Sequence, residues 1–448
     1  MTSHIASIDV GTTNIKINLF NTDYQLLDSL RSAYSNVHTT EEIFEMDLDE
    51  IWQILLDGLK ELSLRHSIDS IELILTTAMH SVQLMDEGFE LIGAMLIWAD
   101  KRGSKALERM SPADKEQQYL RTGTPNHSMN PNFKIRDYYQ AGSRVGSMKD
   151  ILFYRLTGEW AIDICNASSS GLLNIETMTW DQPSMEAIGI TREHLPKIQA
   201  VDYQAPLQAG ILPVAGVVTI GTSDGISSNY VFNDLDKAAV LSVGTSHAVR
   251  AVHNQPLLDD HLNNFSYVID ADHHLIGFPS NNGADVLAWA VRIFNATYEE
   301  LNHIAHLRPK TQSIFQPYLN GERAPIWDES ATGSLFHLSR TSTRESVLYS
   351  IILGMAFNIK QNVEALRNLV GFESIGLVGG IVAMPAVTQL LADVLGYPLH
   401  IPQVENAETL GSIALVKGLT FDKTYHTLQP VRDKELEALY SQYLKLNQ

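Results

Sequence analysis

The stretch SIDVGTT occupies residues 7–13, and a related stretch, LSVGTS, occupies residues 241–246. In each copy an apolar run (5–10 and 238–243) meets a glycine and two hydroxyl residues, and an alternating segment follows. This pattern predicts two β-hairpins whose tight turns expose backbone N–H groups and hydroxyls. Because such a turn can hold phosphate oxygens without a lysine, the duplication predicts a nucleotide held between two related halves.

The two copies differ at one chemically important position, where Asp9 in the first corresponds to Ser242 in the second. Only the first half therefore keeps a carboxylate beside its phosphate-binding turn, as a Mg²⁺ site requires. Neither copy is the GxxxxGK[ST] loop, and no GxGxxG follows a predicted strand, which argues against P-loop and dinucleotide-binding proteins. Either turn alone is an ordinary hairpin turn, and only the duplication with matched flanks favours the nucleotide interpretation.

The composition is that of a globular chain long enough for two domains, with 448 residues, 44% hydrophobic and 19% charged. A single cysteine, Cys165, excludes a disulfide within the chain and a cysteine-rich zinc site, and it fits a reducing compartment. The formal net charge of −20 disfavours nucleic acid and anionic membranes as partners. Without a signal peptide or membrane-spanning run, we expect a cytoplasmic protein with a small-molecule partner, and we consider a homodimer as its assembly.

Hydrophobic periodicity predicts strands and helices mixed in each half. The expected helices cover residues 48–64, 149–156, 345–369, 384–395 and a closing segment near 436–443, and the expected strands cover 71–76, 91–98 and 375–378. The Pro- and Gly-rich stretch 196–213 is expected to be a loop. We place a domain boundary near residue 231, which gives domains 1–231 and 232–448. The expected fold class is α/β, a duplicated core with an interdomain cleft.

Two short segments carry candidate chemistry in the middle and near the end of the chain. Asp224 follows the apolar run 217–220 and could accept a hydroxyl proton while that oxygen attacks phosphorus. An aspartate there is also a common helix N-cap, and the local sequence alone favours that interpretation. Gly379 and Gly380 follow a strand and allow close approach either of an adenosine or of a packed helix.

Other candidates follow two expected strands, and they are Met79, His80, Trp98 and Asp100. Polar residues at such ends tend to face the ligand crevice of an open α/β sheet, although a lone histidine is more often a core residue. Asn126, His127 and Lys134 are expected on a loop because they lie in or beside the Gly/Pro/Asn-rich stretch 122–132. The histidines show no HExxH or cysteine-paired spacing, so a tightly bound transition metal is not expected.

A series of short motifs follows one another along the chain, namely Asp9-Val10-Gly11-Thr12-Thr13, Met79-His80-Ser81, Trp98-Ala99-Asp100, Thr122-Gly123-Thr124-Pro125, Ala167-Ser168, Thr222-Ser223-Asp224-Gly225, Gly244-Thr245-Ser246, Asn281-Asn282-Gly283, the stretch 321–328 and Gly379-Gly380. Together and in this order they resemble the FGGY family of carbohydrate kinases, and within it the gluconate kinases. The resemblance extends from residue 5 to about residue 418. Each motif alone is weak, whereas the collinear set is specific.

The resemblance implies two actin-like (ribonuclease H-like) ATPase domains that close over ATP and a sugar. Asp224 matches the family's catalytic base, and Asp9 matches its Mg²⁺-associated carboxylate. The turns that bind the nucleotide match Gly11, Thr12, Thr13, Gly244, Thr245, Gly379 and Gly380. The segments that line the sugar pocket match Met79, His80, Trp98 and Asp100. We further expect Lys134 or Arg102 to hold a substrate carboxylate against the overall negative charge.

Three positions depart from the family pattern. Ala78 stands where a glutamine commonly precedes Met-His, the stretch 128–130 (SMN) differs from the usual Pro-Met-Tyr of gluconate kinases, and His337 replaces an expected glycine. The first two lie near the substrate and bear on which sugar is bound. Neither Asp9 nor Asp224 is affected, so the departures do not threaten phosphoryl transfer.

The expected activity is ATP-dependent phosphorylation of a sugar or sugar acid at a terminal hydroxyl, with gluconate converted to 6-phosphogluconate as the leading case. The alternatives are a kinase for another polyol or ketose, such as xylulose, ribulose or glycerol, and a chaperone-like or sensor ATPase on the same core. A third alternative is an idle binding protein, against which the intact Asp9 and Asp224 argue. The Asp224 and Met79-His80 segments suit a small ligand, which favours a kinase.

Overall fold

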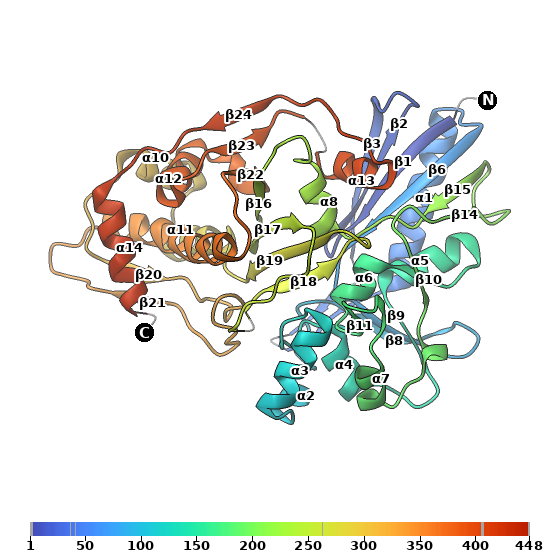
Figure 1. The fold of residues 1–448 in the computed structure, drawn as a ribbon. Helices are drawn as coiled ribbons and strands as arrows, with labels where there is room; N and C mark the ends of the chain where they lie inside the picture. Colours follow the sequence, from blue (N-terminus) through green and yellow to red (C-terminus); the bar gives the residue numbers. More distant parts are fainter. Residues whose placement is uncertain (1–2, 36, 41, 262, 405–406, 447–448) are drawn as a thin grey trace.

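Two large β-sheets, one from each half of the chain, organise the molecule (Figure 1). The structure is a computed structural model, and it describes residues 3–446 apart from residues 36, 41, 262, 405 and 406. The sheet of the first half lies on the right of Figure 1, and the sheet of the second half lies at the centre with the long helix α11 beside it.

The first sheet has the strand order β14-β15-β6-β1-β2-β3. Its strands are β1 (Ser3–Val10), β2 (Asn14–Phe20), β3 (Leu26–Ala33), β6 (Ser70–Thr77), β14 (Gln204–Pro206) and β15 (Ala215–Thr219). β1, β2 and β3 form an antiparallel meander, and β6 and β15 continue the sheet parallel to β1. Helix α1 (Leu48–Arg65) covers one face, because Ile51, Leu55, Leu59 and Leu62 recur at helical spacing and are fully buried.

The second sheet repeats this arrangement, with the order β18-β19-β17-β16-β22-β23-β24. Its strands are β16 (Ala238–Val243), β17 (His247–His253), β18 (Phe265–Val268), β19 (His274–Ser280), β22 (Ser374–Val378), β23 (Leu399–Pro402) and β24 (Tyr425–Leu428). β16, β17 and β19 form the meander, and β22 and β23 run parallel to β16. The predicted α/β fold with two actin-like halves is therefore confirmed, as are both predicted hairpins.

Shorter strands and the remaining helices surround these sheets. A five-stranded sheet contains β4 (Val37–Thr39), β5 (Phe44–Met46), β7 (Val82–Met85), β8 (Leu91–Leu96) and β9 (Arg144–Gly146), and three strand pairs are β10 (Ala161–Asp163) with β13 (Lys197–Gln199), β11 (Leu173–Asn174) with β12 (Thr179–Trp180), and β20 (Ile314–Gln316) with β21 (Ser334–Phe336). The helices are α2 (Ser104–Glu108), α3 (Pro112–Thr122), α4 (Pro131–Tyr138), α5 (Met148–Thr157), α6 (Ile164–Ser169), α7 (Gln182–Ile188), α8 (Asp224–Tyr230), α9 (Asp285–Phe294), α10 (Tyr298–Leu307), α11 (Arg344–Leu369), α12 (Pro385–Leu395), α13 (Ala407–Lys417) and α14 (Lys434–Leu446).

The predicted elements agree with these bounds except in two places. The stretch 196–213, predicted to be a loop, contains β13 and β14. Both are three-residue strands, too short to show a periodic pattern in the sequence; β13 pairs with β10, and β14 pairs with the following strand β15. Lys134, predicted on a loop, lies on α4, which begins with Pro131 after Asn130.

The two halves meet where α13 of the second half packs against α8 and the first sheet (Figure 1). The hydroxyl of Thr409 accepts a hydrogen bond from Asn18 on β2 (2.7 Å), and Thr76 on β6 donates to Ser412 (2.8 Å). A Cβ at Gly411 would overlap the backbone of Ser227 on α8, so the two helices approach closely at this glycine. Because α13 lies on the first sheet, the division of the chain near residue 231 stays a prediction.

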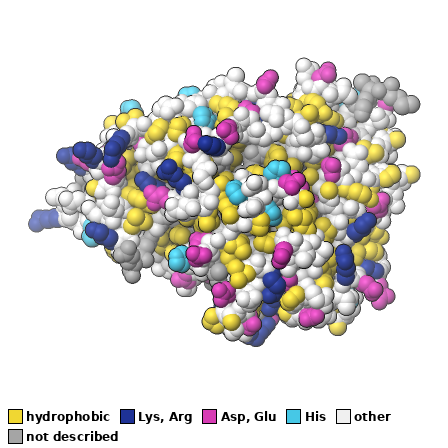
Figure 2. All heavy atoms as spheres, in the orientation of Figure 1, with side chains coloured by type: hydrophobic (Ala, Val, Ile, Leu, Met, Phe, Trp, Pro, Cys, Tyr) yellow, Lys and Arg dark blue, Asp and Glu magenta, His cyan; other side chains and the backbone are white. Residues whose placement is uncertain are grey.

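The face drawn in Figure 2 presents side chains of both charge signs interspersed with apolar ones. The net charge of −20 is thus not gathered into one acidic patch on this face. In the described part of the chain, no helix combines the length and the apolar character that crossing a membrane requires.

Candidate active site

The first hairpin turn joins β1 to β2 directly after Asp9. The Gly11 N–H donates to the Asn14 carbonyl (3.1 Å), and the Tyr34 hydroxyl donates to the Gly11 carbonyl (3.1 Å). The Tyr34 N–H also donates to the Thr13 carbonyl (3.3 Å). Tyr34 therefore braces the turn from β3's end, a contact that the local sequence did not indicate.

The second turn joins β16 to β17 and is braced by the start of α9. The Gly244 N–H donates to the Ser246 carbonyl (2.9 Å), and the Ala284 N–H donates to the Gly244 carbonyl (2.7 Å). The Gly283 N–H donates to the Thr245 carbonyl (3.1 Å). The predicted phosphate-binding residues of this copy thus lie against the start of α9, whose first N–H groups fix the Gly244 and Thr245 carbonyls.

The glycine pair after β22 lies beside this second turn. Gly379 has φ +103°, and a Cβ there would overlap the carbonyl of Val243, the last residue of β16. Only glycine combines this backbone conformation with this close approach. The structure therefore brings Gly379 and Gly380 next to Gly244 and Thr245, as one nucleotide site would require.

Asp9 and Asp224 lie at the carboxyl ends of β1 and β15, the two strands that flank β6 in the first sheet. β1, β6 and β15 are parallel, and their carboxyl ends are joined by hydrogen bonds from Ala78 N–H to the Val10 carbonyl (2.9 Å) and from Thr77 N–H to the Thr222 carbonyl (3.2 Å). α8 begins at Asp224, whose Oδ1 accepts from the Gly225 N–H (2.7 Å). The helix start predicted here is confirmed, although its N-cap is Ser223 and not the aspartate.

A buried lysine that sequence reasoning missed holds these strand ends together. Lys149 on α5 is fully buried, and its Nζ donates to the carbonyls of Ile220 and Thr222 (2.8 Å each) and of Leu75. Burial lowers the pKa of Lys149 to about 8, while the nearby Asp163 carboxylate (3.8 Å) opposes that shift. Asp9 and Asp224 also favour its charged form. The ammonium thus anchors the segment that leads into Asp224.

The predicted sugar-pocket residues Met79 and His80 lie close to this centre. A Cβ at Gly225 would overlap the Met79 methyl and lie 3.5 Å from the Arg250 guanidinium, so both side chains pack at the start of α8. His80 has φ +66°, its Nδ1 is 2.9 Å from the Ser169 carbonyl, and its ring lies 6.0 Å from that of Tyr267. A histidine in this strained region is typical of functional sites.

Trp98 also reaches this region, whereas Asp100 and Arg102 pair with each other. The Arg323 guanidinium lies over the Trp98 ring, 5.3 Å from its centre. The fully buried Asp100 carboxylate accepts from the Arg102 guanidinium (2.8 Å) and from the Phe44 N–H (2.9 Å). Arg102 makes a second ion pair with Glu45 (2.8 Å). The charges of Asp100 and Arg102 are therefore already balanced within the first half of the chain.

Lys134 is fully buried at the same site. Its Nζ donates to the Met129 carbonyl (2.7 Å) and lies 3.5 Å from the Trp98 carbonyl, so the lysine braces the segment 128–130. Burial lowers the pKa of Lys134 to about 7. Nothing in the local sequence distinguishes such a lysine from a solvated one.

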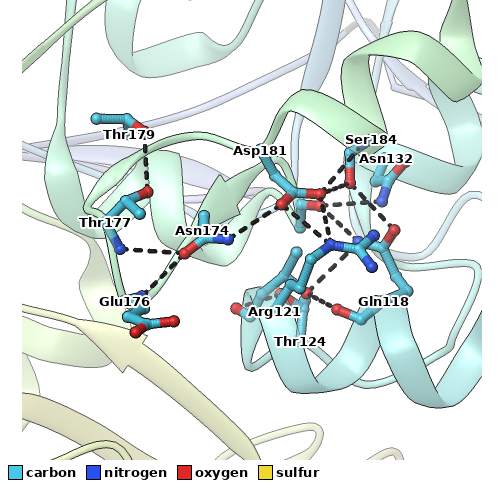
Figure 3. Close-up of polar contacts among 12 residues, drawn as sticks. Gln118, Arg121, Thr124, Asn132, Asn174, Glu176, Thr177, Thr179, Asp181 and Ser184 are labelled. Carbon is cyan, nitrogen blue, oxygen red and sulfur yellow. Dashed lines mark hydrogen bonds and ion pairs between the residues drawn. The ribbon is translucent and has the colours of Figure 1, made fainter.

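The Thr122–Thr124 motif is held by a polar network, part of which Figure 3 shows. Arg121 forms an ion pair with the buried Asp181 (3.1 Å), and Gln118 and Asn132 both donate to the Gly171 carbonyl (3.0 and 2.9 Å). The Gly123 carbonyl in turn accepts from the Ser266 N–H on β18 (2.8 Å). The motif thus connects the first half of the chain to the second sheet.

The third departure noted in the sequence has a conformational counterpart. His337, which replaces an expected glycine, has φ +59°. The chain therefore keeps the left-handed turn at this position despite the Cβ, at a cost of about 1 kcal/mol or more.

His80 gives a testable pH dependence. Burial, with the charges of Lys134 and Arg323, lowers the pKa of His80 from 6.5 to about 3. Between these pH values the unfolded chain binds this proton and the folded chain does not, so stability falls as the pH falls below 6.5. His80→Gln should remove this contribution. Between pH 6.5 and 5 the free energy of unfolding of the variant should therefore fall by about 2 kcal/mol less than that of the parent. Urea unfolding at both pH values checks this, and equal losses would contradict it.

Comparison with known proteins identifies the arrangement. Residues 4–224 match the N-terminal domain of the FGGY family of carbohydrate kinases, and residues 239–416 match its C-terminal domain. A gluconokinase of Bacillus subtilis (strain 168) is 29% identical, with 93% of this chain and 87% of that protein covered.

Solved structures of similar proteins agree with this match. The crystal structure of a gluconate kinase from Lactobacillus acidophilus superposes with a TM-score of 0.92 at 26% identity, covering 100% of this chain and 98% of that one. A xylulose kinase from the same organism superposes with a TM-score of 0.91 at 27% identity, covering 99% of this chain and 97% of that one. The chain therefore belongs to the FGGY family of carbohydrate kinases.

Proposed function

We propose that this kinase transfers the terminal phosphoryl group of ATP to the terminal hydroxyl of gluconate. The observation that carries the proposal is that the Asp9 turn and the Asp224 helix start both lie at the carboxyl edge of the first sheet, after β1 and β15, the two strands that flank β6. In-line phosphoryl transfer needs one carboxylate that helps to hold Mg²⁺ at the phosphates and a second carboxylate that accepts the proton of the attacking hydroxyl. The similarity to a gluconokinase over 93% of the chain supports gluconate as the acceptor.

In this proposal Asp224 accepts the proton of the attacking hydroxyl. Its place at the first residue of α8, with Lys149 fixing the two carbonyls before it, restricts where the carboxylate can lie. The backbone N–H groups of the two turns, with Thr12, Thr13 and Thr245, hold the phosphates, and Gly379 and Gly380 leave room for the adenosine. Positioning of this kind supplies most of the rate in phosphoryl transfer.

The residues present fit a bound Mg²⁺. Magnesium is usually held by one or two carboxylates together with substrate phosphates and waters, and Asp9 beside the first turn provides such a carboxylate. Bound there, the ion would neutralise charge on the transferred phosphoryl group.

The test is ADP production by the purified protein with Mg-ATP across a panel of acceptors. We expect gluconate to stimulate turnover at least about 100-fold over a blank without sugar, within the range that acceptor positioning contributes. Xylulose, ribulose, erythritol and glycerol should stimulate far less, and the product should be 6-phosphogluconate. Preference for a ketose or polyol would overturn gluconate as the substrate. Equal rates with every compound and with the blank would favour a partner-driven ATPase.

A further inference from the structure

Two arginines of the second half, the buried Arg323 and the partly buried Arg250, lie at the candidate site, and neither forms an ion pair with another described residue. Within the described residues neither Arg250 on β17 nor Arg323, which follows Glu322 in the loop after β20, lies within 4.0 Å of a carboxylate oxygen. The Nε atom of each is buried and has no hydrogen-bond partner. A guanidinium taken out of water without a counter-charge is costly, so a chain that keeps one uses it to bind an anion.

The Arg323 guanidinium is held in place by neutral groups only. Its Nη2 donates to the Ser280 carbonyl (2.8 Å), its Nη1 lies 3.7 Å from the Met129 sulfur, and its plane lies near the Trp98 ring. The residue is 8% exposed. These contacts fix the orientation of the Arg323 guanidinium, and none of them is made with an anion. A preorganised anion site requires both properties.

The acid next to it in the sequence, Glu322, favours the charged form of Arg323 but forms no ion pair with it within 4.0 Å. The fully buried Glu322 carboxylate accepts from Ser280 (3.0 Å), Asn282 (3.0 Å) and Asn358 (3.1 Å), and from the Arg323 backbone N–H (2.8 Å). Burial raises the pKa of Glu322 to about 7, while these hydrogen bonds and the charge of Arg323 oppose the shift.

The other charges around Arg323 are mostly positive. Burial, together with the charges of Lys134 and Arg323, lowers the pKa values of His80 and His127 to about 3, although Glu329, 3.3 Å from His127, opposes the shift of that imidazole. Glu329 is an acid close to His127, and its carboxylate accepts hydrogen bonds from the hydroxyls of Ser128 (2.5 Å) and Ser104 (3.1 Å). The region between Trp98, His80 and Arg323 therefore combines fixed positive charge with neutral rings.

Arg250 occupies the opposite end of the same region. Its Nη1 donates to Ser242 (2.9 Å), and the Asp224 carboxylate is the strongest influence that favours its charged form. The Tyr267 ring lies 6.0 Å from the His80 ring, and its buried hydroxyl has no hydrogen-bond partner among the described residues. For an acceptor whose terminal hydroxyl meets Asp224 and whose other end lies beside Trp98, the cation at that other end would be Arg323, which lies over the Trp98 ring.

We propose that Arg323 binds the carboxylate of the acceptor, so that the enzyme selects polyhydroxy acids over neutral polyols of the same length. The inference rests on the proposed function and names the residue that gives it specificity. It also replaces the two candidates expected from the sequence, because Arg102 is paired with Asp100 and Glu45, and Lys134 is committed to the Met129 carbonyl.

The experiment compares gluconate with D-glucitol, which has a hydroxymethyl group in place of the carboxylate. Calorimetry gives the affinity of each compound, and steady-state kinetics give kcat and KM for gluconate. In Arg323→Gln the gluconate KM and Kd should rise at least about 30-fold, in line with the loss of a charge-assisted fork. The kcat should change much less, and the glucitol affinity should stay within about 3-fold.

Two further variants separate this role from a loss of folding. Arg323→Lys keeps the positive charge but lacks the planar guanidinium that can donate two parallel hydrogen bonds. It should bind gluconate more tightly than Arg323→Gln and less tightly than the parent. Arg432→Gln removes the same charge from an arginine whose side chain is 80% exposed, and it should leave both affinities unchanged. Binding of a non-hydrolysable ATP analogue to each variant reports whether the nucleotide site is intact.

The outcomes distinguish this inference from the proposed function. If the parent enzyme phosphorylates gluconate and Arg323→Gln keeps the preference for gluconate over glucitol, Arg323 does not bind the carboxylate and the proposed function stands. An equal loss of affinity for both compounds would assign Arg323 a general positioning role and overturn the inference. If the parent enzyme neither binds nor phosphorylates gluconate, the proposed function fails, and the inference fails with it.

Discussion

Asp224→Asn should lower kcat for the sugar acceptor by about 10²–10⁴-fold, the usual contribution of a general base. The amide keeps the shape of the side chain and can still accept from the Gly225 N–H, so α8 should remain intact. It cannot take up the hydroxyl proton. The Kd of an ATP analogue should stay within about 3-fold of that of the parent, because the phosphate-binding turns are separate from this side chain.

Steady-state kinetics with calorimetry check this expectation. Asp114→Asn is a matched control, because Asp114 is also an aspartate in the first turn of a helix, is exposed, and lies on α3. It should change kcat by less than about 2-fold, as surface substitutions generally do. A kcat of Asp224→Asn near that of the parent would contradict the assignment of the base.

Lys149→Met should be the most destabilising single change considered for this chain, at about 3–5 kcal/mol of unfolding free energy. Methionine fills similar volume but donates no hydrogen bond, so the carbonyls of Leu75, Ile220 and Thr222 would be left buried without this donor. Asp163, 3.8 Å away, would lose the cation nearest to it.

The same substitution should also lower kcat, because the freed segment leads directly into Asp224. Urea unfolding measures the stability, and the kinetics are run well below the midpoint so that only folded enzyme contributes. Lys237→Met is the control, since Lys237 has a side chain that is 59% exposed and pairs with Glu373 at the surface. It should cost less than about 0.5 kcal/mol. A fully stable Lys149→Met with normal turnover would show that the lysine does not anchor these strands.

Much of the fold could be predicted because it depends on short-range signals. The hairpins follow from alternating apolar runs around glycine and hydroxyl residues, and α11 follows from apolar residues that recur every three or four positions. The C-terminal bounds of α5 and α12 follow from Gly158 and Gly396, both of which adopt the left-handed conformation at the cap.

The two incorrect predictions have different physical causes. β13 and β14 in the stretch 196–213 are three-residue strands, too short for a period-two pattern to appear in the sequence. The Gly, Pro and Asn before Lys134 predict a loop, yet the Asn130-Pro131 pair is also a helix start with proline in the first turn, and the chain forms that helix.

By itself the sequence determined the duplicated α/β core, the two turns, and the placement of Asp9, Asp224 and Gly379 at strand ends, because glycine and strand-end chemistry act within a few residues. Only the tertiary structure decided which charges are balanced. Lys149 meets carbonyls 71, 73 and 74 positions away, Arg102 pairs with Glu45 from a separate strand, and Arg323 is buried beside Trp98 with no ion pair to another described residue. Whether a buried charge stabilises the fold or remains available to bind a ligand depends on the groups that distant segments bring next to it. These neighbours are fixed only when the chain has folded.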